Sequence, residues 1–120
     1  MERLSFAADV AFVPRGDLLE GVTVAPLSAP MAQGAPFQAA IFRFAPGGRI
    51  ARHPATDPQI LAVLEGSGEV SGANGVTEPV GAGDAVYWAA GEEHEATSKG
   101  GLTALIVEGE GLAPFERREP

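Results

Sequence analysis

Short blocks of apolar residues, broken about every ten residues by glycine or proline, run along most of this chain. Its 120 residues include 16 Gly and 10 Pro. No stretch keeps the apolar spacing of an amphipathic helix, whereas many short strands separated by turns at this interval are typical of β-sandwiches and barrels. The sequence therefore predicts an all-β fold of antiparallel strands.

Ten segments fit this description, which is more than one open sheet usually carries, so we expect a sandwich or a barrel. Two of these segments are separated by Asn74-Gly75, the residues that most easily adopt the positive φ values of a two-residue hairpin. The candidate strands are residues 10–13, 22–27, 37–45, 50–53, 59–65, 69–71, 76–80, 85–88, 94–98 and 102–107.

The composition fits a single domain. Apolar residues make up 45% of the chain, enough for a core at this length, and the lack of cysteine excludes disulfide frameworks, thiolate metal sites and cysteine nucleophiles. The net charge of −8 argues against a nucleic-acid partner, and no apolar run is long enough to span a membrane. We expect a cytoplasmic protein with one domain over residues 1–120, comprising a core of about 20–108, an N-terminal arm of 1–9 and a C-terminal tail of 109–120.

The chain contains only two histidines, His53 and His94, and each follows a turn at the edge of a predicted strand. In an antiparallel barrel the inward side chains of different strands face one cavity. Imidazole is the commonest transition-metal ligand, and it titrates near neutral pH. Two imidazoles in one cavity would form the beginning of a metal site or a proton-transfer site.

The residues around both histidines follow a regular spacing. In PGGRIARHPATDPQILAVLEGSG (residues 46–68), five residues separate Gly47 from His53, and Gln59 and Gly66 follow at fixed intervals. In GAGDAVYWAAGEEHEATS (residues 81–98), Gly83 is followed at similar fixed intervals by Gly91, His94 and Ser98.

These two stretches resemble the two motifs of the cupin superfamily. The resemblance implies a small single-domain cupin, which is an antiparallel double-stranded β-helix or jelly-roll barrel, and a homodimer. In the metal-binding cupins, two His and a Glu of the first motif and the His of the second hold one divalent ion. This chain has Ala55 in place of the second His and Gln59 in place of the Glu.

These departures leave three interpretations of His53, Gln59 and His94. Two imidazoles and an amide oxygen could hold a divalent metal (Zn, Ni, Cu, Fe or Mn) weakly, with water completing the shell. The same three side chains could instead hydrogen-bond a small polar ligand without a metal. In the third interpretation, side chains fill the interior and no functional cavity exists.

Two further residues are candidates for ligand contacts. Trp88, the only tryptophan, leads into the second motif and could stack on a ligand or belong to the core. Arg49 and His53 are four residues apart, so in a regular strand their side chains point to the same face. Arg49 could therefore bind an anionic group, or it could lie in solvent. Of the glutamates beside His94, we expect Glu93 and Glu95 to face solvent, because they alternate with it along the strand.

The sequence therefore predicts a small cupin-fold protein that binds a small polar molecule in its barrel and has a degenerate metal site. The alternative is a metal-dependent cupin enzyme of isomerase or oxygenase type that uses His53, Gln59 and His94. A fold hosts many functions, so the barrel alone does not decide between them.

Overall fold

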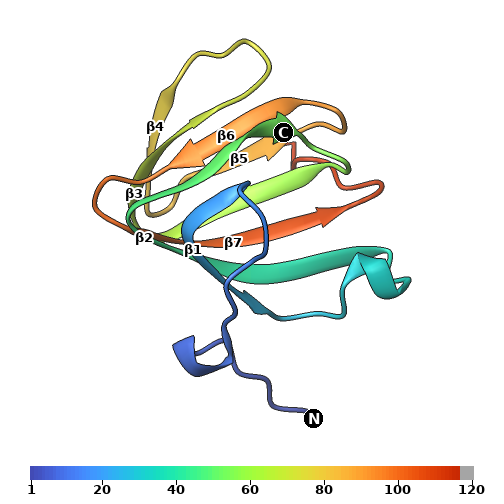
Figure 1. Ribbon diagram of the computed structural model, residues 1–120. Coiled ribbons are helices and arrows are strands. Elements are labelled where there is room, and N and C mark those ends of the chain that lie inside the picture. Colours follow the sequence, from blue (N-terminus) through green and yellow to red (C-terminus); the bar gives the residue numbers. More distant parts are fainter. Residues whose placement is uncertain (117–120) are drawn as a thin grey trace.

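Strands account for nearly all the regular structure of the computed structural model, which describes residues 1–116 (Figure 1). The elements in chain order are η1 (Ala8–Val10), β1 (Leu19–Pro26), η2 (Met31–Gln33), β2 (Phe37–Pro54), β3 (Gln59–Ser71), β4 (Glu78–Gly81), β5 (Ala85–Trp88), β6 (Glu93–Thr97) and β7 (Leu102–Gly109). Both helical elements are single 3₁₀ turns of three residues. The predicted all-β class is confirmed, and no helix within residues 1–116 is long and apolar enough to cross a membrane.

Two long, bent strands close the barrel. The first half of β2 pairs with β1 and β7, and its second half pairs with β6. The strand β3 pairs with β7 and β5 along its first half and with β4 and β6 farther on. All these pairings are antiparallel, so the strands form the predicted antiparallel barrel (Figure 1).

The predicted strand boundaries differ from the observed ones at these bends. Residues 37–45 and 50–53 were expected as two strands but belong to one, because Gly47, with φ of 84°, bends β2 without ending it. Residues 59–65 and 69–71 merge in the same way into β3, where a Cβ on Gly66 would collide with the carbonyl of Gly101, the residue before β7.

The chain ends also differ from the predicted pattern. Residues 10–13 were expected to form a strand, but only a single β-bridge joins Phe12 to Val24. The predicted C-terminal tail was expected to begin at Gly109, but this residue still belongs to β7. The last four residues of that tail, 117–120, lie outside the described residues.

The apolar core lies inside the barrel, because alternate residues of each strand point inward. Along β7, Leu102, Ala104 and Ile106 are buried, and they pack with Leu61 and Val63 of the neighbouring β3. The core includes inward residues from β1 to β7, among them Trp88, whose ring packs against His94.

Candidate functional site

His53 and His94 lie directly opposite each other on the adjacent strands β2 and β6. Their ring centroids are 4.4 Å apart, and the ring planes are inclined by 50°. Directly opposite residues of an antiparallel pair share one face of the sheet, and this face is the inside of the barrel. The fold therefore brings together the two imidazoles that the sequence singled out.

Backbone carbonyls orient both imidazole rings. The Nδ1 atom of His53 lies 2.7 Å from the Ala51 carbonyl oxygen, and Nδ1 of His94 lies 3.1 Å from that of Glu92. A carbonyl oxygen can only accept a hydrogen bond, so each Nδ1 carries the proton and donates it. In the neutral rings, each Nε2 therefore keeps a free lone pair.

His94 is held in a dry environment. Its side chain is only 2% exposed, and the ring of Trp88 packs against it with centroids 4.5 Å apart. Burial lowers the pKa of His94 below its ordinary value, and the nearby His53 lowers it further. The neutral form of His94 is thus favoured, and this ring can accept a proton or a hydrogen bond.

Gln59 belongs to a polar row across three strands. In register, Gln38 of β2 lies opposite Glu108 of β7, and Glu108 lies opposite Gln59 of β3. The Gln59 amide donates to Glu108 Oε2 at 3.1 Å, and the Gln38 amide donates to Glu108 Oε1. Gln38 also accepts a hydrogen bond from the backbone N–H of Met31 at 2.7 Å, which ties the β1–β2 connection to this row.

Glu108 is a site residue that sequence reasoning missed. The second recognised motif ends at Ser98, so no motif spacing pointed to the last strand. Strand alternation could have found it, since Glu108 continues the inward series of Leu102, Ala104 and Ile106. A charged residue at the next inward position of an apolar strand marks a polar feature inside the barrel.

These residues line a cavity of about 260 Å³ inside the barrel. A second, smaller cavity of about 120 Å³ shares the walls Phe42, Ile106 and Glu108 with it. Small-molecule sites in proteins are mostly apolar hollows with a few convergent polar groups, and this cavity has that composition. Its lining comprises Leu18, Leu19, Phe42, Ile50, His53, Pro54, Thr56, Gln59, His94, Ile106 and Glu108.

Two predicted ligand contacts lie elsewhere. Trp88 is buried in the core behind His94 and does not line the cavity. Arg49 is exposed on the outside, where it pairs with Glu20 at 3.2 Å. A register shift between Ile50 and His53 breaks the strand parity that had placed Arg49 and His53 on one face.

The glutamates beside His94 face away from the cavity, as expected for Glu93 and Glu95. Glu93 is exposed, and Glu95 accepts a hydrogen bond from the Ser71 hydroxyl. Glu92 has a structural contact: its carboxylate accepts hydrogen bonds from the backbone N–H groups of Ala89 and Ala73, which lower its pKa. This side chain joins the turn before β6 to the β3–β4 hairpin, next to the backbone carbonyl that holds His94.

The donor set fits a tightly held divalent metal poorly. Within residues 1–116, no three or more His, Cys, Asp or Glu side chains cluster closely enough to hold an ion. Two imidazoles and the neutral amide of Gln59 supply no anionic ligand, and the Glu108 carboxylate does not form a ligand group with the two histidines. The metal that the cupin resemblance implies therefore lacks a complete ligand set in this chain.

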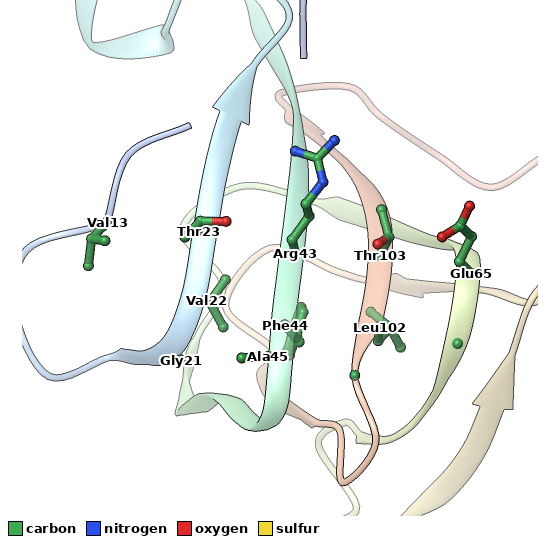
Figure 2. A pocket seen from close by; sticks show the side chains of 12 residues that line it. Val13, Gly21, Val22, Thr23, Arg43, Phe44, Ala45, Glu65, Leu102 and Thr103 are labelled. Atoms are coloured by element: carbon green, nitrogen blue, oxygen red, sulfur yellow. The ribbon is translucent and has the colours of Figure 1, made fainter. Parts of the chain in front are cut away.

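A hollow of about 600 Å³, larger than the barrel cavity, lies away from the histidines. It extends across β1, β2, β7 and β3, and Figure 2 shows Thr23, Arg43, Thr103 and Glu65 side by side on these four strands. Its lining contains neither histidine and no residue of the Gln38–Glu108–Gln59 row. We therefore place the candidate site inside the barrel.

Solved structures show the same fold. The chain is 28% identical to the polyketide cyclase RemF from Streptomyces resistomycificus, with a TM-score of 0.76, over 91% of this chain and 79% of that one. It is 27% identical to a predicted oxalate decarboxylase from Thermotoga maritima, with a TM-score of 0.68, over 77% and 84% of the two chains. A Cupin 2 conserved barrel domain protein from Salinispora arenicola shares 22% identity and a TM-score of 0.73, over 92% and 90%.

The amino-acid sequence also matches a protein-family model. No match was found among curated proteins. The model of the Cupin_2 family, described as a cupin domain, matches residues 40–110, which include both histidines, Gln59 and Glu108. This match covers more than half of the chain and agrees with the antiparallel barrel, so the chain belongs to the Cupin_2 family of the cupin superfamily.

Proposed function

We propose that this protein binds a small, largely apolar molecule with polar substituents in the barrel cavity, without needing a metal. The observation that supports the proposal is that two imidazoles, Gln59 and Glu108 line one cavity whose other walls are mostly apolar. The volume of about 260 Å³ suits a single ring-sized molecule.

Apolar residues and the two histidines would make different kinds of contact with the ligand. Leu19, Phe42 and Ile106 supply apolar contacts, and His53 and His94 accept hydrogen bonds from the ligand's polar group. The backbone carbonyls that hold each Nδ1 fix both rings before the ligand arrives, which reduces the entropy lost on binding.

A cupin enzyme is the second candidate, favoured by the two free Nε2 lone pairs and by the similarity to a polyketide cyclase. In the version with a metal, of isomerase or oxygenase type, His53, Gln59 and His94 would be the ligands. A bound ion would supply Lewis-acid or redox chemistry. Without one, the neutral ring of His94 would accept a proton from a bound substrate.

Fluorescence of the single tryptophan tests the proposed function, because Trp88 stacks on His94. Untagged protein with a chelator present would be titrated with a panel of ring-sized alcohols, amines and carboxylic acids. We expect saturable binding by at least one class, lost in His94→Ala and retained in the exposed-site control Lys99→Ala. Binding that requires one tightly bound metal per chain, or no binding by any class, would contradict the proposal.

We also propose that the protein forms a homodimer through the outer face of β2, β7 and β3. On this outward face Ile41 is buried and five further residues are apolar and only half-buried, whereas the free face of an antiparallel sheet is usually polar. These half-buried side chains are Ala39, Ile60, Ala62, Leu105 and Val107.

A row of charged and hydroxyl residues beside this apolar face favours a second copy as the partner. Arg43 and Glu65 lie on either side of Thr103, one strand away in each direction (Figure 2). The Nη1 atom of Arg43 is buried and lacks a hydrogen-bond partner among the described residues. A two-fold axis would place Glu65 of each copy near Arg43 of the other, so the surface is complementary to itself.

A further inference from the structure

We infer that the ligand of the barrel cavity is a small organic ammonium and that Glu108 is its anchor. This inference rests on the proposed function and adds the chemical class of the ligand. It depends on which polar atoms in the cavity remain able to donate or accept a hydrogen bond.

The imidazoles and the amide present acceptors to the cavity. In their neutral forms, His53 and His94 donate their only ring N–H groups to backbone carbonyls. Each ring then has only the Nε2 lone pair available to a ligand. A carboxylate can only accept, so the Gln59 amide nitrogen must face Glu108, and the amide oxygen is left for the ligand. A ligand that donates hydrogen bonds satisfies all three side chains, whereas a ligand that only accepts satisfies none of them.

Glu108 adds a negative charge to these acceptors. Its two oxygens receive one hydrogen bond each, from Gln38 and Gln59. A carboxylate has about four lone-pair positions, so about two remain available. Both partners of Glu108 are neutral amides, which orient the carboxylate without neutralising it.

Among the described residues, no lysine or arginine lines the cavities to pair with Glu108. A carboxylate held between apolar walls is costly unless a cation pairs with it, and a bound ammonium supplies both the positive charge and up to three donors. The net charge of −8 on the whole chain favours the approach of a cation as well.

The apolar walls define the rest of the ligand. Leu19, Phe42 and Ile106 surround the polar groups, so an ammonium on a short apolar or aromatic body is complementary to the cavity. A carboxylate or phosphate of the same size would face Glu108 with like charge. An alcohol would satisfy the acceptors but would leave the carboxylate without a counter-ion.

Three probes of matched shape test the inference: benzylammonium, benzyl alcohol and benzoate. Each would be titrated into the full chain with a chelator present, following Trp88 fluorescence and heat of binding. We expect benzylammonium to bind at least about tenfold more tightly than the other two, as a charge-assisted hydrogen bond provides. Glu108→Gln should lose that preference, Glu108→Asp should keep part of it, and the exposed-strand control Glu69→Gln should match the parent protein.

Each outcome has a definite meaning. Benzoate or benzyl alcohol binding as tightly as benzylammonium, or Glu108→Gln binding benzylammonium unchanged, would overturn the inference while leaving the proposed cavity function standing. The absence of binding by all three probes up to millimolar concentration would overturn the inference as well. The proposed function itself fails only if the wider panel of alcohols, amines and acids also fails to bind. Thermal unfolding of each variant shows whether it is folded.

Discussion

His53 and His94 are cross-strand partners whose ring centroids lie 4.4 Å apart inside the barrel. Each ring donates its Nδ1 proton to a backbone carbonyl two residues earlier in the chain. In their neutral forms, the two rings therefore keep their Nε2 lone pairs in a cavity that Glu108 also lines.

The stability of the protein should fall as the pH drops below about 6.5, the ordinary pKa of histidine. Burial lowers the pKa of His94 in the folded state, so the unfolded chain binds its proton first as the solution becomes acidic. The contribution of His94 is thus complete above the unfolded pKa and is lost on going below it. Chemical unfolding across this pH range should show that the free energy of unfolding decreases as the pH falls. The decrease should be smaller in His94→Gln than in the parent protein. Equal decreases would mean that His94 is not desolvated.

Removing the Gln38 side chain should destabilise the fold by about 1–3 kcal/mol, the usual cost of leaving a partly buried charged group without its hydrogen bond. Gln38 donates to Glu108 and accepts from Met31 N–H, so Gln38→Ala removes both contacts. The matched control is Gln33→Ala, an exposed glutamine in η2, which should change the free energy of unfolding little. Urea unfolding of both variants is the measurement, and similar losses in the two would contradict a specific role for Gln38.

Glu92→Gln should cost about 1–2 kcal/mol and disturb His94, because charge-assisted hydrogen bonds from two backbone N–H groups are weakened. The hydrogen bond from Ala89 lowers the pKa of Glu92 most, so its contribution is present above the ordinary pKa and is lost as the pH falls through the folded value. Unfolding measurements and Trp88 fluorescence would follow both effects. The exposed neighbour variant Glu93→Gln should leave both signals near those of the parent protein.

Charge reversal tests the proposed dimer. Arg43→Glu should shift the protein from dimer to monomer in light scattering, because the carboxylate introduced by this substitution would repel Glu65 of the other copy. The double variant Arg43→Glu with Glu65→Arg should restore the dimer, since both charges are exchanged. A monomeric parent protein, or a double variant no better than the single one, would rule out this arrangement.

Much of the fold and part of the site could be predicted from the sequence. The spacing of glycine and proline predicted an all-β antiparallel fold, the cupin resemblance implied the barrel, and the two motifs located His53, Gln59 and His94. Strand parity failed for Arg49, because the register shift before His53 lets both Ile50 and His53 line the cavity. This register shift depends on how β2 bends between its pairing with β7 and its pairing with β6, which no local sequence pattern reveals.

Glu108 could not be identified as a partner of Gln59 by motif alone. The two residues are neighbours only because β7 lies between β2 and β3 in the barrel. Pairing between strands far apart in sequence is set by the whole topology, and a single sequence gives only the alternation within each strand. Glu108 lies one residue beyond the predicted strand 102–107, and its two glutamine partners required the structure.

Long-range ¹⁵N NMR tests whether the two imidazole rings offer their Nε2 lone pairs to a cavity ligand. This measurement reports which nitrogen of each neutral ring carries the proton. At mildly alkaline pH, we expect Nδ1 of His53 and His94 to be protonated and both Nε2 atoms to be bare, with the two Nε2 signals shifting when benzylammonium is added. Protonated Nε2 atoms, or Nε2 signals that do not shift with any cavity ligand, would contradict the proposed role of the two histidines in binding.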